Sequence, residues 1–339
     1  MEKIKVGQIG ICHEHAAGKM RTLRLLPDVF EIVGVVDERP TTAARFAGDD
    51  LTPYNGLKFV TEEELFNTPG LQAVTVETPN ADLVPTALRV MEHKLAMHLD
   101  KPGGEELEPF GHLLRGCQER HLPFQMGYMF RNNPAMQWCL NAVRQGWLGE
   151  IFEVQAGMSH NYGGDAYQPY LGHFRGGIMF NLGCHLVDWV VAMLGRPENI
   201  TPFLKTTPGL PGTIKNNGLA ILDYPHATVT LRACSCEVDG LNRRRLKLCG
   251  TNGSVELCPL ERFDGQPLQM NLVLKDAIPG HAAGAHTVEF GIVRDRYEDQ
   301  LLEWAKIING EMANPYTYEH DYRVQEVVLA AAGYTPWKP

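Results

Sequence analysis

The chain has 339 residues, of which 44% are apolar and 21% are charged, and its formal net charge is −9. This length suits two domains, and the composition is that of a globular protein rather than a disordered one. The net negative charge argues against nucleic acid and against an anionic membrane surface as partners, because both favour a basic protein face.

The eight cysteines are scattered along the chain, with no C-x-x-C pair and no Cys/His cluster of zinc-site spacing. Cysteines in such a pattern are typical of buried thiols in a reducing compartment. We expect no secretory leader, because the first residues lack an apolar segment with a cleavage site. No apolar run approaches the roughly 18 residues of a membrane span. The sequence therefore predicts a cytoplasmic protein with no membrane partner.

In the first 124 residues, short and nearly continuous apolar runs alternate with helical patterns. Such runs predict parallel strands that are buried on both faces. Right-handed crossovers between them give an open, doubly wound sheet, the architecture of a dinucleotide-binding Rossmann domain. Thr61, followed by three glutamates, is expected to cap a helix. The expected strands cover residues 4–10, 30–37, 58–60, 73–77, 95–99 and 123–128. One helix is expected to begin near residue 16, and two more are expected to cover residues 81–93 and 106–120.

The pattern changes near residue 128, where longer strands with alternating apolar and polar residues begin. In one of them Val229, Leu231 and Ala233 share a face, which is typical of an antiparallel sheet with one packed side. We therefore predict an α/β fold class, with a Rossmann domain in residues 1–124 and an α+β domain with a large, mostly antiparallel open sheet in residues 125–339. The expected strands of the second domain are 151–160, 218–224, 227–235, 246–250, 254–257 and 270–274, and its expected helices are 134–145, 295–309 and 320–332.

The turn after the first strand lies where the pyrophosphate of a dinucleotide would bind backbone N–H groups at a helix N-terminus. It retains only the first glycine of a G-x-G-x-x-G fingerprint. Asp37 ends the second strand at the spacing of a ribose-binding acid; the alternative is an ordinary polar strand end. Its carboxylate would repel a 2′-phosphate, so we predict NAD rather than NADP, although Arg39 would tolerate the phosphate. The candidate cofactor residues here are Gly10, Ile11, Cys12, His13, His15 and Asp37.

His13 and His15 flank Glu14 and raise the question of a metal ion. Ligands two residues apart on a tight turn rarely converge on one ion without further ligands, so no metal is predicted. The remaining interpretations are hydrogen bonding at the cofactor phosphates or near the substrate, and a simple exposed turn.

Two segments carry residues suited to hydride transfer. Lys101 directly follows a predicted parallel strand, at the sheet edge where ligands bind. Its ammonium would stabilise alkoxide character in an alcohol that loses its proton; the alternative is a solvated surface lysine. His185 shares one predicted helix stripe with Asn181 and Asp188, which fits a general base at a domain cleft; the alternative is a structural core histidine.

The order of these motifs resembles that of the glucose-fructose oxidoreductase and inositol 2-dehydrogenase family (Gfo/Idh/MocA) over nearly the whole chain. The resemblance implies an open C-terminal sheet that often forms the interface of a homodimer or homotetramer. It also implies sugars, cyclitols or related polyols as substrates, and Lys101 and His185 as catalytic residues. The motifs that carry it are Thr78-Pro79-Asn80, Asp100-Lys101-Pro102, residues 127–134, Leu148-Gly149-Glu150-Ile151, the glycine-rich helix that ends in His185 and Asp188, and Gly250-Thr251-Asn252-Gly253-Ser254.

The remaining candidates come from these motifs and from residues 161–175, an irregular stretch that would serve as an active-site loop. At the join between the domains, polar side chains would line a cleft, unless residues 127–134 are only a linker. The cofactor site gains Thr78, Pro79, Asn80 and Lys101, and the candidates for binding substrate are Asn181, Tyr128, Arg131, Asp188, Asp165 and His160.

The sequence departs from the family pattern in three places. The phosphate loop has Cys12 and His15 where glycine or a small residue is usual. Asp100 stands where glutamate is common before the lysine. Asn181 stands where the family usually has an aspartate paired with the histidine. An amide can neither take a proton nor stabilise an imidazolium as a carboxylate does. We therefore expect His185 to find its partner in Asp188 or Asp165, or the chemistry to differ.

Three hypotheses follow. In the first, NAD⁺ accepts a hydride from a secondary alcohol, His185 removes the hydroxyl proton and Lys101 stabilises the alkoxide. In the second, which Asn181 motivates, a sugar carbon is oxidised only transiently, so that glycoside cleavage or epimerisation occurs without net cofactor turnover. In the third, the chain is a non-catalytic sensor of NAD or sugar, and the joint presence of Lys101 and His185 speaks against it.

Overall fold

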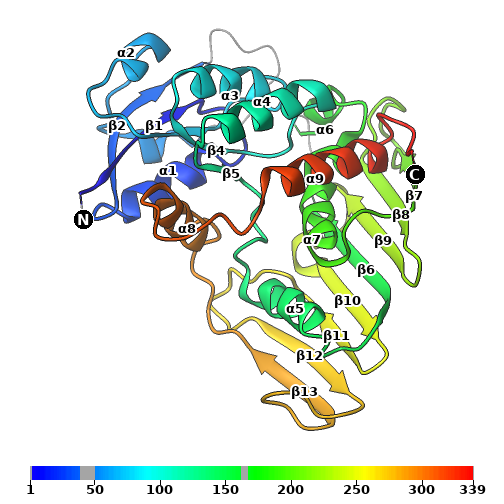
Figure 1. The fold of residues 1–339 in the computed structure, drawn as a ribbon. Helices are drawn as coiled ribbons and strands as arrows, with labels where there is room; N and C mark the ends of the chain where they lie inside the picture. Colours follow the sequence, from blue (N-terminus) through cyan, green and yellow to red (C-terminus); the bar gives the residue numbers. More distant parts are fainter. Residues whose placement is uncertain (1, 39–49, 162–166, 339) are drawn as a thin grey trace. The chain divides into compact units, whose positions relative to one another are not determined.

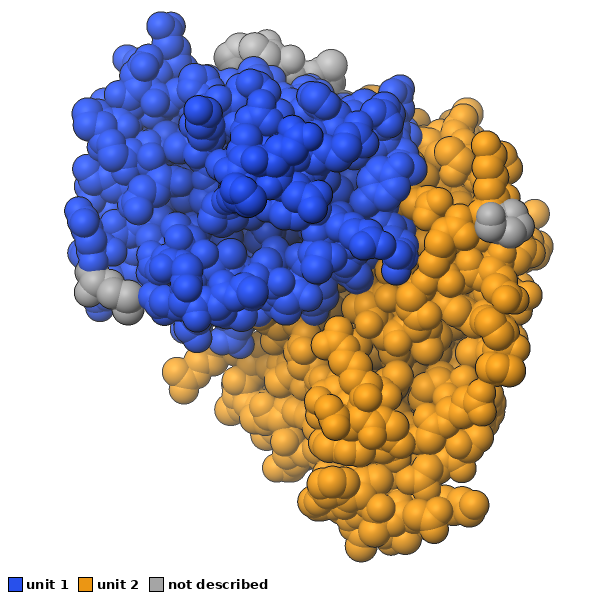
Figure 2. All heavy atoms as spheres, viewed as in Figure 1, with its two compact units in different colours: residues 1–129, 297–325 blue, residues 130–296, 326–339 orange. Residues whose placement is uncertain are grey.

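A computed structural model describes residues 2–38, 50–161 and 167–338 of the chain (Figure 1). The chain divides into two compact units (Figure 2). Unit 1 comprises residues 1–129 and 297–325, and unit 2 comprises residues 130–296 and 326–339. The domains expected from the sequence, 1–124 and 125–339, differ from these units at the join and in residues 297–325.

Unit 1 is built on a five-stranded sheet of order β2-β1-β3-β4-β5 in which all pairs are parallel. Strands β3, β4 and β5 are buried along their whole length, as expected where helices cover both faces of a parallel sheet. This confirms the predicted Rossmann-like architecture. The strands are β1 (Ile4–Ile9), β2 (Phe30–Val36), β3 (Ala73–Val76), β4 (Ala96–Leu99) and β5 (Phe124–Met126).

The helices of unit 1 lie on both faces of this sheet. The chain moves from β1 to β2 in one direction across the sheet and from β3 to β5 in the other. Right-handed crossovers therefore place α1 on one face and α3 and α4 on the opposite face (Figure 1). The helices are α1 (Ala16–Leu25), α2 (Glu62–Phe66), α3 (Leu83–Glu92), α4 (Leu107–Glu119) and α8 (Glu298–Ile308), with a 3₁₀ turn at Thr52–Tyr54.

Helix α8 packs with the N-terminal strands although it lies far from them in the sequence. Leu301 and Trp304 of α8 join one apolar cluster with Ile4, Met20 and Phe30. The rings of Trp304 and Phe30 stack with centroids 6.1 Å apart. This burial of large side chains, worth about 1.5–3 kcal/mol each, explains why residues 297–325 belong to unit 1.

Two local predictions in unit 1 have different outcomes. Thr61 caps α2 in a capping box, since its hydroxyl accepts from the Glu64 N–H and the Glu64 carboxylate accepts from the Thr61 N–H. The strand predicted at residues 58–60 is reduced to a single parallel bridge between Phe59 and Val35. Only the Lys58 carbonyl and the Val60 N–H reach the edge of β2, because the chain turns at once into the capping box.

Unit 2 contains an eight-stranded sheet of order β13-β12-β11-β10-β6-β9-β8-β7. Every neighbouring pair is antiparallel except β6 and β9. The predicted large and mostly antiparallel sheet is therefore confirmed. The strands are β6 (Ile151–Ser159), β7 (Asn199–Lys205), β8 (Asn217–Asp223), β9 (Thr228–Cys234), β10 (Arg245–Gly250), β11 (Gly253–Leu257), β12 (Gln269–Leu274) and β13 (Gly284–Glu289).

Strands β7 and β13 form the two edges of this sheet and were not predicted from the sequence. Edge strands bury few side chains and show a weak apolar pattern, and β13 has no fully buried residue.

Helices α5 and α7 contact each other, and α7 contacts β6 (Figure 1). None of the described helices is long and apolar enough to cross a membrane. The remaining helices are α5 (Pro134–Arg144), α6 (Tyr167–Leu171), α7 (Cys184–Leu194) and α9 (Tyr318–Ala331), with a π-helical turn at Met179–Gly183 and a 3₁₀ turn at Gly240–Arg243.

Candidate functional site

The strand order of unit 1 reverses between β1 and β3, and ligands of open α/β sheets bind at such a switch point. Gly10 follows β1 there, with φ of +98°. A Cβ at this position would lie 2.4 Å from both the Glu77 carbonyl carbon and the Thr78 nitrogen. Only glycine fits, which explains why the first glycine of the fingerprint is retained. Thr78, Pro79 and Asn80 continue from β3 and are buried beside it.

The backbone of the turn after Gly10 already binds an anionic group. The N–H of Ile11 donates to Glu38 Oε2 at 2.9 Å, and the N–H of Cys12 donates to Oε1 at 3.1 Å. Burial raises the pKa of Glu38, against the effect of these two hydrogen bonds. Two converging N–H groups are what a phosphate needs, so a bound pyrophosphate would take the place of this carboxylate. Glu38 was not predicted; the only signal is an acid directly after Asp37.

A cavity of about 420 Å³ opens at the carboxyl ends of β1, β2 and β3. Its volume lies within the range of small-molecule sites. Asp37, the expected ribose-binding acid, lines it together with apolar side chains. Gly10, the N–H pair and this cavity therefore fit a dinucleotide. The lining residues are Ile9, Val36, Asp37, Glu38, Glu62, Thr78, Asp82, Pro85, Thr86 and Arg89.

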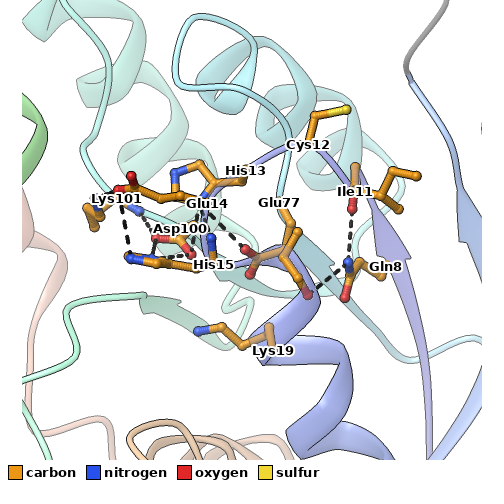
Figure 3. A network of polar contacts seen from close by, with 12 residues as sticks. Gln8, Ile11, Cys12, His13, Glu14, His15, Lys19, Glu77, Asp100 and Lys101 are labelled. Carbon is orange, nitrogen blue, oxygen red and sulfur yellow. Dashed lines mark hydrogen bonds and ion pairs between the residues drawn. The ribbon is translucent and has the colours of Figure 1, made fainter. Parts of the chain in front are cut away.

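Beside the switch point, a buried group of polar side chains surrounds Asp100 at the end of β4 (Figure 3). We call His13, His15, Glu77 and Asp100 the Asp100 cluster. His15 Nδ1 lies 3.1 Å from each Asp100 carboxylate oxygen, and His13 Nδ1 lies 3.5 Å from Oδ2. His13 Nδ1 also accepts the His15 backbone N–H at 3.2 Å. The sequence suggested each histidine separately, but not their meeting at Asp100.

The two carboxyls of the cluster have opposite pKa shifts. For Asp100, burial alone would raise the pKa, but His13, His15 and Lys19 outweigh it and hold the pKa well below its usual range. For Glu77, burial and then the charge of Asp100 raise the pKa well above its usual range. Burial lowers the pKa of His13 to about 4, so its imidazole is neutral at pH 7. Burial and neighbouring charges therefore favour the ionised form of Asp100 and the protonated form of Glu77.

Lys101 is a buried residue and not a solvated surface lysine. Its ammonium donates to Glu14 Oε1 at 2.8 Å, and its backbone N–H donates to Asp100 Oδ1 at 2.6 Å. Burial alone would raise the pKa of Glu14, but Lys101 and the two neighbouring histidines lower it to about 2. Glu14 was not predicted as a site residue, although it lies between the two histidines that were.

A second buried lysine lies below the turn and was also not predicted. Lys19 Nζ is 2.6 Å from His98 Nε2, and His98 Nδ1 is 2.9 Å from Gln125 Oε1. The Tyr297 ring centroid lies 4.4 Å from the same ammonium. A lysine in the helix after a phosphate loop usually faces solvent, so the burial of Lys19 beside His98 is seen only in the tertiary structure.

In unit 2, His185 and Asn181 lie where a π-helical turn continues into α7. Such turns occur frequently at functional sites. Asn181 Nδ2 donates to Tyr167 Oη at 2.8 Å. His185 is fully buried, and its ring meets the Phe130 ring edge-on at 5.9 Å. The equal helical spacing assumed for Asn181, His185 and Asp188 is therefore interrupted at Asn181, since the π-turn adds a residue there.

Arg131 and Asp188, two of the predicted substrate-binding residues, pair with each other. Arg131 Nε lies 3.1 and 3.2 Å from the two Asp188 oxygens, and Nη2 lies 2.6 Å from Oδ1. Both side chains are almost fully buried. Asp188 is thus engaged by Arg131. Asp165, the other expected partner of His185, lies outside the described residues.

Tyr128 and His160 are the last two predicted substrate-binding residues. Tyr128 is buried in unit 1, where its carbonyl accepts from Gln300 Nε2 at 3.2 Å. His160 follows β6 in unit 2, and its Nε2 contacts the Arg244 guanidinium. Within each unit the structure therefore gathers part of the predicted site: the phosphate turn with Lys101 in unit 1, and Asn181 with His185 in unit 2.

Comparison with known proteins finds a family model that matches part of the chain. Residues 136–256 match the GFO/IDH/MocA C-terminal domain. An uncharacterised oxidoreductase of Schizosaccharomyces pombe is 23% identical over 68% of this chain, and the match spans 64% of that relative. An uncharacterised oxidoreductase of Escherichia coli is 26% identical over 43% of this chain, and that match spans 42% of the relative. The match therefore spans less than two thirds of either curated relative.

Solved structures share the fold of the whole chain. An oxidoreductase from Agrobacterium radiobacter, in complex with NAD⁺, L-tartaric acid and magnesium, is 17% identical with a TM-score of 0.79, over 98% of this chain and 96% of that one. A UDP-N-acetylglucosamine 3-dehydrogenase from Acidithiobacillus ferrooxidans is 16% identical with a TM-score of 0.76, over 99% and 98%. A 3-ketoreductase mutant from Actinomadura kijaniata, in complex with TDP-benzene and NADP, is 16% identical with a TM-score of 0.74, over 97% and 96%.

The resemblance drawn from the sequence motifs is therefore confirmed over residues 136–256, which match the GFO/IDH/MocA C-terminal domain, and solved oxidoreductases share the fold of both units.

Proposed function

We propose that this chain is an NAD(H)-dependent oxidoreductase that transfers a hydride from a secondary alcohol carbon of a sugar, cyclitol or related polyol. The observation that carries the proposal is Lys101, a buried ammonium directly after β4, on the sheet edge that Gly10 and Thr78 also border. The family match and neighbours that include a sugar-nucleotide dehydrogenase support the same class of reaction.

The cofactor would be held by groups of unit 1. The N–H groups of Ile11 and Cys12 would bind the pyrophosphate once Glu38 has moved away, and Asp37 would accept from the ribose hydroxyls. A negative charge at Asp37 disfavours a 2′-phosphate, which supports NAD over NADP. The bound dinucleotide supplies a nicotinamide ring that accepts the hydride.

The remaining steps belong to side chains of the protein. His185 would remove the hydroxyl proton, and Lys101 would stabilise the charge that develops on the alcohol oxygen. An ammonium has three donor hydrogens, one of which goes to Glu14. Asn181 would bind a further hydroxyl through its amide, the group that replaces the usual carboxylate.

The contact between Asn181 and Tyr167 favours keeping a second candidate. The Asn181 amide donates to a tyrosine hydroxyl instead of supplying a carboxylate for His185. A residue set without that carboxylate also suits transient oxidation, in which the hydride returns after elimination or epimerisation at a neighbouring carbon. The two candidates differ in whether reduced cofactor leaves the enzyme.

A thermal-shift screen with NAD, NADP and a panel of sugars and cyclitols tests the proposal. A ligand that binds the native state raises the melting temperature, so we expect NAD and at least one polyol to do so. Incubation of that polyol with excess NAD should then accumulate NADH. Tightly retained cofactor without NADH release supports transient oxidation, and no shift with either dinucleotide contradicts both candidates.

Asp37→Ser tests the cofactor preference, and Asp28→Ser in an exposed turn is its control. Removing the charge at Asp37 should raise the affinity for NADP relative to NAD by about tenfold or more. The control variant should keep the wild-type ratio. A cytoplasmic location and a homodimer or homotetramer remain predictions, and size-exclusion chromatography with light scattering measures the latter.

A further inference from the structure

The proposed function gives no role to the convergence of the Asp100 cluster. His13, His15 and Asp100 each direct a ligand atom to one place, and these atoms all lie within 4.8 Å of one another. The three residues come from the turn after β1 and from the end of β4. Figure 3 shows the lines of contact from both histidines to Asp100 and from His13 to Glu77.

The distances match those between ligands of one small ion. A tetrahedral ion with bonds of about 2.1 Å holds its ligand atoms about 3.4 Å apart. The atoms of His15 and Asp100 are 3.1 Å apart, and those of His13 and Asp100 are 3.5 Å apart. These values bracket the expected edge.

Glu77 is a fourth buried residue beside these three. One of its carboxyl oxygens lies 3.9 Å from His13 Nδ1, and its carboxyl shares a hydrogen bond with Asp100. Glu77 is therefore a neighbour of the site and not one of the three residues whose ligand atoms converge.

We propose that the Asp100 cluster binds one divalent first-row transition-metal ion, with His13, His15 and Asp100 as its protein ligands. Imidazole ligands favour zinc, iron or nickel over magnesium and calcium, which prefer oxygen alone. The ion would replace the contact between His13 Nδ1 and the His15 N–H. The site goes beyond the proposed function and does not depend on it.

Such an ion would have a structural consequence. It would tie the turn after β1 to the end of β4, which carries Asp100. Two histidines two residues apart do not make a site, which is why no metal was predicted from the sequence. Asp100 supplies the missing ligand from 85 residues beyond His15.

Metal binding by the full, untagged chain tests the proposal. After dialysis against EDTA, the protein is equilibrated with Zn²⁺, Co²⁺ or Mg²⁺ and the bound metal is measured by mass spectrometry. We expect about one Zn²⁺ per chain, a visible absorption band with Co²⁺ that reports nitrogen ligands, and much weaker Mg²⁺ binding. Zn²⁺ should also raise the melting temperature.

His15→Gln should weaken Zn²⁺ binding by about 100-fold or more, because it removes a ligand. His112→Gln on the exposed face of α4 is the matched control and should bind as the wild type does. Circular dichroism and the melting temperature of the metal-free variants show whether each is folded. The proposal is overturned if the folded wild type binds no Zn²⁺, if His15→Gln binds it normally, or if His112→Gln loses as much affinity.

Discussion

Unit 1 and unit 2 each bury charged side chains, but they satisfy them in different ways. In unit 2, the Arg131 guanidinium and the Asp188 carboxylate meet in one close ion pair. In unit 1, the Asp100 cluster combines two carboxyls, which share a hydrogen bond, with two imidazoles. Both groups are buried, so their solvent exposure does not distinguish them.

The difference separates two uses of buried charge. The close pair between Arg131 and Asp188 fixes the start of the segment before α5 to helix α7. Two histidines that converge on one buried carboxylate are better suited to bind a ligand than to hold a fold.

Asp188→Ala should destabilise the protein by about 3–5 kcal/mol, because it leaves the Arg131 guanidinium buried without its carboxylate. Urea denaturation followed by circular dichroism measures the loss. The double variant Arg131→Met with Asp188→Leu should recover much of it, since an apolar pair of similar volume is often tolerated. A single variant as stable as the wild type would show that the pair is not structural.

Lys101→Ala should lower turnover by about 10²–10³-fold while leaving NAD binding largely intact, because the ammonium acts on charge that develops during the reaction. Steady-state kinetics and a thermal shift with NAD separate the two effects. Lys306→Ala, an exposed lysine of α8, is the control and should match the wild type. Unchanged turnover in Lys101→Ala would remove it from the catalytic role.

Glu14→Gln should change the acid stability of the protein. The folded pKa of about 2 lies below the ordinary value of 4.5. The carboxylate therefore contributes stability above pH 4.5, which is lost as the pH falls toward 2, on the order of 2–3 kcal/mol. Acid unfolding of EDTA-treated protein should show that the wild type has the higher free energy of unfolding above pH 4.5, and that this difference disappears as the pH falls toward 2. Glu108→Gln on exposed α4 should show no such gap; a constant gap for Glu14→Gln would contradict the linkage.

Thr61→Ala should destabilise the protein by only about 1 kcal/mol, because it removes one hydrogen bond of an exposed capping box. This variant sets the scale of a solvent-exposed polar contact against the buried pair and the buried cluster. Thr61→Ser, which keeps the hydroxyl, is the matched control in the same thermal denaturation. A loss as large as that of Asp188→Ala would show that burial is not what separates these contacts.

Features that depend on local chain chemistry could be predicted from the sequence alone. Buried apolar runs predicted β1, β3 and β4, because a strand covered on both faces needs apolar residues along its length. Gly10 and Thr61 followed from backbone geometry and capping. The place of Lys101 after a parallel strand predicted its presence at the ligand edge of the sheet.

Which polar groups contact one another depends on the tertiary structure. Glu38 binds the N–H of Ile11 across 27 residues, and Asp100 meets His15 across 85. Such pairings depend on strand order and register, which join residues that no local pattern connects. Packing in the folded chain likewise assigns α8 to unit 1 and pairs Arg131 with Asp188. Periodicity reports which face of an element is buried, but the partner on the other side is set by the fold.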